Sequence, residues 1–283
     1  MPELPEVETI RRQLNKHILE KTIVGIKVIS KKSFIGDSSR LINKKVIKIL
    51  RFGKYFCFQL TKNLFLNFHL KMTGQLLYAR DMNKAQFNTK IPFTKTDTMP
   101  GKTTRVIINF NDNSGLFFND LRKFGWAKVG NKPEQPKGVD VLSKEFTIHY
   151  FIKIVRTSKK RIKILLIDQD KLSGIGNIYA NEILFNARIN PLRVSLFLKP
   201  LEISKLFQAI KKIIEQGIRF GGSSSADEAF IQTDGSKGRF QQRLYVYQRE
   251  DKSCHVCKTL IKRIKHGGRS SFYCPNCQPI IHI

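Results

Sequence analysis

Two pairs of cysteines near the C-terminus constrain the fold of this chain more than any other feature of its sequence. Cys254 and Cys257 are followed, after 16 intervening residues, by Cys274 and Cys277, so each pair has the CxxC spacing. A CxxC turn can direct two thiolates at one ion, and four thiolates are typical of a structural zinc site. The intervening residues suit a β-hairpin that carries Lys258, Lys262, Arg263, Lys265, His266 and Arg269. We therefore expect one structural Zn²⁺ in a basic finger.

Two alternatives to this interpretation remain open at this point. A CxxC pair can be a redox dithiol, although two matched pairs favour a metal. A zinc finger can also serve folding alone rather than the binding of a partner. The fifth cysteine, Cys57, stands in an apolar run, and an odd count without an export signal argues against a disulfide framework.

The charge balance limits the possible partners. The chain has 51 Lys+Arg against 22 Asp+Glu, a formal net charge of +29. Nucleic acid is the first candidate, because each neutralised phosphate releases counterions, and an anionic membrane surface is the alternative. No apolar run approaches the roughly 20 residues of a membrane span. The N-terminus is acidic where a signal peptide is basic, so we expect a protein of the cytoplasm or nucleoid.

The apolar pattern predicts an α+β protein. A helix over 6–20 precedes short segments rich in β-branched and aromatic residues, which suggests a sandwich. These strand-like segments are 22–30, 45–50, 55–60, 64–70, 105–110, 116–119 and 126–129, and 79–104 is expected to be a loop. Helical spacing returns over 143–157, 160–168, 178–189 and 202–219, and a Gly/Ser-rich loop follows at 221–238. The predicted division is an N-terminal β-sandwich over 1–130, a linker over 131–142, a helical domain over 143–238 and the zinc finger over 239–283.

Three internal motifs are less specific. A Gly-x-Gly turn in LSGIGNIYANEILF (172–185) leads to Asn177, a suitable N-cap, and such a helix start can bind phosphate. A helix–turn–helix corner without a ligand would have the same sequence. Met72 lies in HLKMTG, and Arg122 and Phe124 lie in NDLRKFG, where an exposed Arg beside an aromatic ring could probe a base stack. Met at a turn and Phe at a strand start are more often part of a core.

The first ten residues, MPELPEVETI, place Pro2, Glu3 and Glu6 at the start of the first helix. Removal of Met1 would leave Pro2 with a secondary amine that can attack an aldehyde carbon and form an iminium. The pKa of an α-amino group is about 8, so more of it is unprotonated at neutral pH than of a lysine. Glu3 and Glu6 would serve as proton donor and acceptor. The alternative is that proline and glutamate merely start a helix well.

Together these motifs resemble bacterial formamidopyrimidine-DNA glycosylases, members of the helix–two-turn–helix glycosylases, over essentially the full length of the chain. The matching segments, in the family's order and spacing, are MPELPEVET, GKYF (53–56), HLKMTG (69–74), DLRKFG (120–125), IDQDKLSGIGNIYANEILF (167–185), GGSS (221–224), FQxxLxVY (240–247) and GRSSFYCPNCQ (268–278). Agreement among independent motifs from three regions makes the resemblance specific.

The resemblance implies a bifunctional base-excision-repair enzyme, a DNA-formamidopyrimidine glycosylase that is also a DNA-(apurinic or apyrimidinic site) lyase. Such an enzyme removes 8-oxoguanine and formamidopyrimidines through a Schiff base and then cuts the strand by β,δ-elimination. The implied partner is double-stranded DNA with oxidised bases or abasic sites, bound by a monomer. One structural zinc is the implied cofactor, without a catalytic metal, because the iminium acts as the electron sink.

The resemblance also assigns roles to residues. Pro2 attacks C1′ of a flipped nucleotide, Glu3 assists opening of the sugar ring, and Glu6 organises the site and its water. Lys54 contacts phosphate and lesion, and the 221–238 loop folds over the extruded base. The implied catalytic set is Pro2, Glu3, Glu6, Lys54 and Arg269, and the implied DNA-binding set is Met72, Arg122, Phe124, Lys163 and Asn177. Asn177 and Arg269 are expected to clamp phosphates, while Met72, Arg122 and Phe124 fill the gap and wedge the opposite strand.

Departures from the family pattern, which include VDV at 139–141 and DKSC at 251–254, leave loop details open. Arg105 stands where the family usually has a histidine, and Ile164 stands where proline is common. An endonuclease VIII-like relative that acts on oxidised pyrimidines is the nearest alternative, although MPELPE, HLKMTG and DLRKFG favour the purine enzyme. A non-catalytic zinc-finger nucleic-acid binder is the alternative from a different class.

Overall fold

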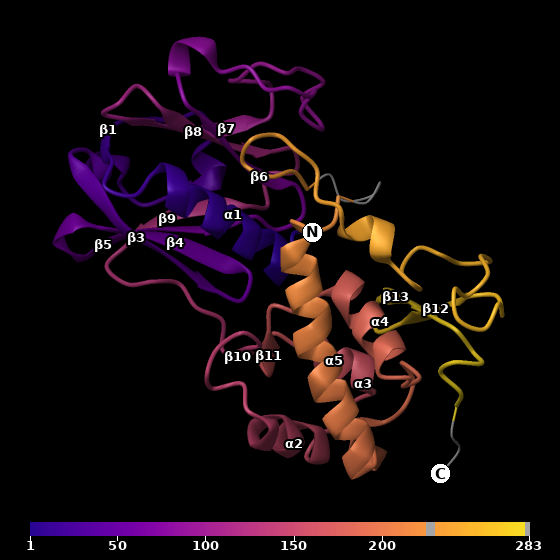
Figure 1. Ribbon diagram of the computed structural model, residues 1–283. Coiled ribbons are helices and arrows are strands. Elements are labelled where there is room, and N and C mark those ends of the chain that lie inside the picture. Colours follow the sequence, from indigo (N-terminus) through magenta and orange to yellow (C-terminus); the bar gives the residue numbers. More distant parts are fainter. Residues whose placement is uncertain (225–229, 281–283) are drawn as a thin grey trace. The chain divides into compact units, whose positions relative to one another are not determined.

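The computed structural model describes residues 1–224 and 230–280 and divides the chain into two compact units, and most of its helices and strands are labelled in Figure 1. Unit 1 comprises Met1–Gln135 with Gly217–Gln241, and unit 2 comprises Pro136–Gln216 with Gln242–Ile283. Residues 225–229 of the predicted 221–238 loop lie outside the described residues. The rest of that loop groups with unit 1, whereas the sequence-based division places it with the helices. The predicted domain boundaries themselves stay a prediction.

Unit 1 opens with helix α1 (Leu4–His17). Its start is fixed by Glu3, whose backbone N–H donates to Glu6 Oε2 at 2.8 Å, and by Pro5 in the first turn. The apolar face of the helix is fully buried through Val7, Ile10 and Leu14. The helix predicted over 6–20 is therefore confirmed. It begins two residues earlier, because Glu3 is the N-cap and Pro5 lies in the first turn, and it ends three residues earlier, at His17.

A nine-stranded sheet follows, in the order β2-β9-β5-β4-β3-β1-β7-β8-β6. Its neighbours are antiparallel except for β2 and β9, which are parallel. The strands are β1 (Thr22–Val28), β2 (Phe34–Ile35), β3 (Lys44–Phe52), β4 (Tyr55–Leu60), β5 (Leu64–His69), β6 (Gly74–Ala79), β7 (Thr104–Phe110), β8 (Gly115–Asp120) and β9 (Trp126–Gly130).

The sheet folds into the expected sandwich. Strands β1 and β3 pair only at Thr22↔Lys45 and Ile23↔Lys44, so the ladder narrows at the middle of the sheet. Side chains from both halves then share one apolar core, in which the rings of Phe68 on β5 and Phe118 on β8 lie 6.1 Å apart. All seven predicted strands are present, and β2 and β6 are additional.

The predicted loop over 79–104 contains little regular structure but is anchored. It holds a 3₁₀ turn at Met82–Lys84 and an isolated bridge between Gln86 and Thr98. Apolar side chains of this segment form a second core cluster with side chains of the sheet and with one residue that follows α5. The cluster comprises Leu77, Ala79, Ala85, Phe87, Ile91, Met99, Ile107, Phe117 and Ile231. The segment is therefore packed against the sandwich rather than extended into solvent.

Unit 2 is mostly helical. Its elements are β10 (Val139–Asp140), α2 (Ile148–Arg156), α3 (Ile162–Leu166), β11 (Leu172–Ser173), α4 (Asn177–Asn186), α5 (Pro200–Arg219), β12 (Lys262–His266) and β13 (Arg269–Tyr273). Helix α2 starts later than the predicted 143 because Thr147 caps it, its Oγ1 accepting from the Tyr150 N–H at 3.2 Å. Among the described residues, no helix is both long and apolar enough to cross a membrane.

Helix α4 holds the finger in place through two adjacent side chains. The Glu182 carboxylate accepts hydrogen bonds from the backbone N–H groups of residues 245, 246 and 247 at 2.9–3.0 Å. The Asn181 Oδ1 accepts one from the Phe272 N–H on β13 at 2.8 Å. Burial raises the pKa of Glu182, and the three N–H donors oppose that rise. The zinc-finger hairpin is thus tied directly to the helix that follows the Gly-x-Gly turn.

Candidate active site

The first residues of α1 form a buried polar centre in unit 1. Pro2 is buried, and Glu3 and Glu6 are each 1% exposed. The two oxygens of Glu6 have separate partners: Oε2 accepts from the Glu3 N–H and Oε1 from the Ser223 N–H, both at 2.8 Å. Gly222 leaves no room for a side chain, because a Cβ there would lie 2.9 Å from Glu6 Cγ. The structure therefore brings Pro2, Glu3 and Glu6 together and adds the 222–223 backbone to them.

Glu8, the third acid of the opening sequence, has a different environment. Its carboxylate accepts from Arg11, Arg12 and Arg51, with N–O distances of 2.8–2.9 Å. Burial would raise the pKa of Glu8, but hydrogen bonds from Arg11 and Arg12 and the charge of Arg51 outweigh it and lower the pKa to about 2. Glu8 is therefore a permanent anion that fixes α1 to the end of β3, not a proton donor.

Lys54 lies in the tight turn between β3 and β4, where it is buried. The register Tyr55↔His69 places this turn at the same end of the sheet as the HLKMTG segment. His69 Nδ1 accepts from the Lys71 N–H at 3.0 Å. Burial, with the charges of Lys71 and Lys54, lowers the pKa of His69 to about 3, so the imidazole is neutral at physiological pH.

The three predicted wedge residues gather in one exposed cluster at that end of the sheet. Met72 is 47% and Phe124 48% exposed, so neither is part of a core. Arg122 Nη1 lies 3.1 Å from Met72 Sδ, and the Arg122 guanidinium lies over the Phe124 ring, 4.7 Å from its centroid. Lys71 and Lys123, the neighbours of this cluster, both have left-handed backbone, with φ of 51° and 56°.

In unit 2, the Gly-x-Gly turn leads into α4 as expected, but the N-cap is Gly176 rather than Asn177. Asn177 is the first helical residue, and its Oδ1 is buried with no partner among the described residues. The predicted N-cap is wrong by one residue because Gly176 already has the extended backbone that a cap requires. Gln169 ties the turn together, accepting from the Gly174 N–H and donating to the Ile175 carbonyl.

Lys163 and Arg269 meet different surroundings in unit 2. Lys163 is 0% exposed, and its Nζ donates to the Ser270 carbonyl at 2.6 Å and to Ser271 Oγ at 2.8 Å. It thus supports the finger hairpin from α3. Arg269 starts β13 beside the Gly267–Gly268 turn, where its side chain is exposed. The DNA contacts expected of these two residues, and of the other residues in the predicted sets, stay predictions.

The four cysteines of the C-terminal pairs form a compact cluster. Their Sγ atoms all lie within 4.8 Å of one another, with Cys257–Cys274 at 3.3 Å and Cys254–Cys277 at 3.9 Å. A tetrahedral Zn²⁺ with Zn–S bonds of about 2.3 Å needs sulfurs about 3.8 Å apart. The hairpin of β12 and β13 joins the two pairs, as predicted. The donor set fits one structural zinc ion.

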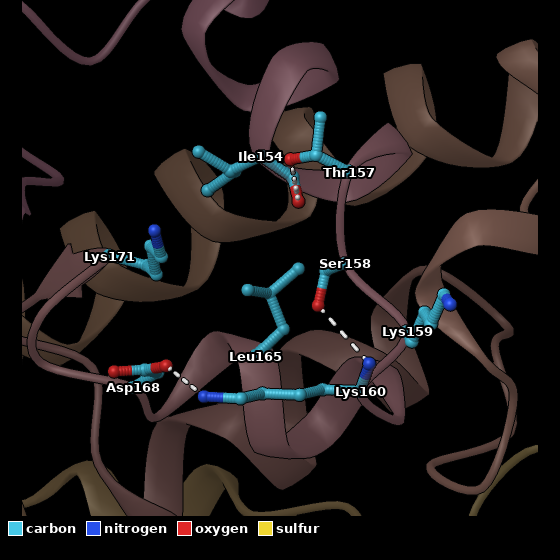
Figure 2. A pocket seen from close by; sticks show the side chains of 8 residues that line it. All are labelled: Ile154, Thr157, Ser158, Lys159, Lys160, Leu165, Asp168 and Lys171. Atoms are coloured by element: carbon cyan, nitrogen blue, oxygen red, sulfur yellow. Dashed lines mark hydrogen bonds and ion pairs between the residues drawn. The ribbon is translucent and has the colours of Figure 1, made fainter.

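A separate pocket of about 520 Å³ lies in unit 2, and Figure 2 shows the side chains around it. Its lining residues are Ile154, Thr157, Ser158, Lys159, Lys160, Leu165, Asp168 and Lys171, and the predicted site residues are not among them. Lys160 is paired with Asp168 at 2.6 Å. The negative end of α2 adjoins the pocket, which weakens its attraction for anions.

Comparison with known proteins identifies the family to which a chain with this site is similar. Three family models match consecutive parts of the chain: the formamidopyrimidine-DNA glycosylase N-terminal domain over residues 1–127, the formamidopyrimidine-DNA glycosylase H2TH domain over 138–229, and the zinc finger found in FPG and IleRS over 251–280. The chain is 38% identical to the formamidopyrimidine-DNA glycosylase of Pelotomaculum thermopropionicum, over 99% of this chain and 100% of that protein.

The chain belongs to the formamidopyrimidine-DNA glycosylase family. The family member from Carboxydothermus hydrogenoformans is 37% identical over 98% of this chain and 100% of its own length. The crystal structure of the MutM (Fpg) protein from Thermus thermophilus matches with a TM-score of 0.84 at 30% identity, covering 98% of each chain. The Lactococcus lactis Fpg in complex with abasic-site DNA matches with a TM-score of 0.83 at 30% identity, over 98% of this chain and all of that one.

The glycosylase family membership confirms the fold predicted from the sequence, with its sandwich, its helical H2TH part and its zinc finger. The contacts that complete the site are not evident from the sequence. The Ser223 N–H donates to Glu6, and Arg51 donates to Glu8 from β3. The GGSS motif at 221–224 was the one available signal for Ser223.

Proposed function

We propose that this protein is a bifunctional base-excision-repair glycosylase that removes oxidised purines from DNA and then cuts the strand at the resulting abasic site. The observation that carries the proposal is the buried Pro2–Glu3–Glu6 centre in a chain of this family. Relatives support the substrate class, because solved Lactococcus lactis Fpg structures contain abasic-site DNA and Fapy-dG DNA.

Pro2 is the proposed nucleophile. Once Met1 is removed, the lone pair of the Pro2 nitrogen attacks C1′ of the damaged nucleotide. The N-glycosidic bond breaks, and the base leaves with a proton. Glu3 donates a proton to the ring oxygen of the sugar as it opens, which leaves an iminium between Pro2 and C1′. With Met1 attached, the nitrogen is an amide and has no such lone pair to offer.

The iminium then withdraws electrons from the sugar. A proton leaves C2′ and the 3′ phosphate departs in β-elimination; a second elimination expels the 5′ phosphate, and water hydrolyses the adduct to free Pro2. Glu6 orients the Glu3 backbone and the 222–223 backbone through the two bonds of its carboxylate. The remaining predicted residues would hold the DNA: Lys54, Met72, Arg122, Phe124, Lys163, Asn177 and Arg269.

The zinc ion would be held by Cys254, Cys257, Cys274 and Cys277 and would supply folding free energy to the finger. Four sulfur ligands fill a tetrahedral shell, which leaves no position for a substrate. The finger then carries Arg269 on a stapled hairpin. A net charge of +29 favours DNA as the partner, and we propose that the protein acts as a monomer in the cytoplasm or nucleoid.

Borohydride trapping on a duplex with an abasic site tests the proposal. The wild-type protein should form a covalent adduct, Pro2→Gly should lose it, and Lys54→Ala should keep it. An adduct that survives in Pro2→Gly but is lost in Lys54→Ala would move the nucleophile to the lysine. Intact mass spectrometry of the same sample shows whether Met1 is absent.

The two alternatives give different results. An enzyme of the endonuclease VIII type would release thymine glycol in preference to 8-oxoguanine paired with cytosine. A non-catalytic zinc-finger binder would form no adduct with any abasic substrate while still binding duplex DNA. The proposal holds if the adduct forms and 8-oxoguanine is the preferred base.

A further inference from the structure

The two exposed loops of unit 1 that carry the predicted wedge are joined by one buried carboxylate. We call residues 70–73, between β5 and β6, and residues 121–124, between β8 and β9, the wedge loops. Asp120 ends β8 and is 0% exposed, although the loop after it is exposed. The Thr73 hydroxyl, at the end of the first wedge loop, donates a hydrogen bond to Asp120 Oδ1.

The same carboxylate also holds both ends of the second wedge loop. The Arg122 N–H lies 3.1 Å from Thr73 Oγ1 and 3.1 Å from Asp120 Oδ1. The Gly125 N–H donates to Asp120 Oδ2 at 2.7 Å. Asp120 therefore accepts from donors in both loops, and hydrogen bonds to a charged acceptor are the stronger kind.

The packing around this carboxylate is tight. A Cβ on Gly125 would lie 3.0 Å from both Asp120 Oδ2 and Phe118 Cζ, so the second loop has little room to shift. The backbone of Asp120 is fixed as well. Its N–H donates to the Thr103 carbonyl at 2.9 Å, and its carbonyl accepts from Arg105 Nε at 2.7 Å. Arg105, the residue that departs from the family pattern, thus supports the same point from β7.

We propose that Thr73 and Asp120 are positioning residues that lock the two wedge loops into one rigid body, so that Met72 enters the base stack together with Arg122 and Phe124. This inference rests on the proposed function. Extruding a base costs a few kcal/mol of unstacking, and a wedge must be held in place to supply it. If the two loops were held separately, contact with the DNA could displace them, and the base would remain in the stack.

Two substrates separate this role from a general structural one. Release of 8-oxoguanine from a paired duplex needs the wedge, whereas cleavage at a preformed abasic site does not need a base extruded from a pair. Thr73→Val keeps the size of the side chain and removes the hydroxyl. It should slow 8-oxoguanine release about tenfold, the effect of one lost charge-assisted hydrogen bond, and change abasic-site cleavage less than about twofold.

Further variants provide rescue and controls. Thr73→Ser keeps the hydroxyl and should restore release, while Asp120→Asn and Met72→Ala should repeat the pattern of Thr73→Val. Thr61→Val removes a hydroxyl that accepts from a backbone N–H elsewhere in unit 1, and it should behave as wild type. Asp112→Asn is the matched control for Asp120, because Asp112 accepts from Ser114 in the turn at the other end of β8 and should not affect release.

The outcomes are distinct. Wild-type release by Thr73→Val would overturn the inference, and so would equal loss on both substrates, since that indicates a folding defect. If Asp120→Asn fails to fold, Thr73→Val still decides, because Thr73 is only partly buried. Fluorescence of 2-aminopurine beside the lesion reports unstacking without catalysis and should rise less with Thr73→Val. A wild-type protein that cleaves neither duplex would contradict the proposed function. In that case the difference in 2-aminopurine fluorescence between the wild type and Thr73→Val still tests the inference, because it does not require catalysis.

Discussion

A hydrogen bond of 2.8 Å joins the Glu6 carboxylate to the backbone N–H of Ser223, although 217 positions of sequence separate the two residues. Because the other Glu6 oxygen accepts from the Glu3 N–H, one buried side chain links the chain start to the loop that follows α5. A movement of Ser223 would therefore shift Glu6 and, through it, the backbone of Glu3, where the proposed chemistry takes place.

Glu6→Ala should remove this link. Two backbone N–H groups lose a charged acceptor, so we expect 8-oxoguanine release to fall by at least about tenfold, measured in single-turnover kinetics. Glu20→Ala is the matched control, because Glu20 is an exposed glutamate of the turn after α1 and should leave release unchanged. Wild-type release by Glu6→Ala would show that the Ser223 bond has no part in the reaction.

The arginine cluster around Glu8 predicts how stability depends on pH. The pKa of Glu8 is lowered from 4.5 to about 2, so its stabilisation is complete above about pH 4.5 and is lost as the pH falls through 2. Glu8→Gln should lower the midpoint of thermal unfolding at pH 7 by roughly 5 °C. Its midpoint should also fall less steeply than that of the wild type between pH 4.5 and 2. Parallel pH profiles for the two proteins would contradict this account.

Native mass spectrometry should find one zinc ion per chain. Cys254→Ser should lose both the ion and tight DNA binding, because a thiolate ligand of the finger is removed. Cys57→Ala should keep both, since Cys57 is buried in β4 and burial raises its thiol pKa to about 12. Full DNA affinity in zinc-free Cys254→Ser would show that the finger has no role in binding.

Salt dependence should distinguish the two predicted phosphate contacts of unit 2. Arg269→Ala removes a cation, so the slope of log K against log salt should become shallower by about 0.9. Asn177→Ala removes a neutral donor and should weaken binding at every salt concentration with an unchanged slope. Lys27→Ala, an exposed lysine on β1, is the charge control and should alter neither quantity. An unchanged slope in Arg269→Ala would rule out the phosphate contact.

The sequence predicted those parts of the fold whose signals are local. The spacing of apolar residues along the chain indicated helix α1 and most of the strands. The spacing of the cysteines likewise indicated the four-sulfur cluster. Strand β6 was missed because it opens at Gly74 and depends on pairing with β8, where Gly74 lies opposite Asp120. Such pairing depends on residues far apart in sequence, and no local pattern reports it.

The candidate site was predicted to a similar extent. Motifs singled out Pro2, Glu3 and Glu6, and the structure places them together. The role of Ser223 could not be read from the sequence, because its bond to Glu6 crosses the fold. The same holds for the Arg51 partner of Glu8, whereas Arg11 and Arg12 lie three and four residues after Glu8 on the same helix. The alternative that Met72 and Phe124 belong to the core is excluded by their exposure.

The left-handed backbone at Lys71 and Lys123 has a consequence for how this protein responds to heat. A residue with a Cβ loses roughly 1 kcal/mol in that conformation, and glycine would not. The chain instead keeps two cations there, beside Met72 and Phe124 at the rim of the sandwich. Stability is thus traded for positive charge, so glycine at either position should raise the midpoint of thermal unfolding while removing one cation from the wedge loops.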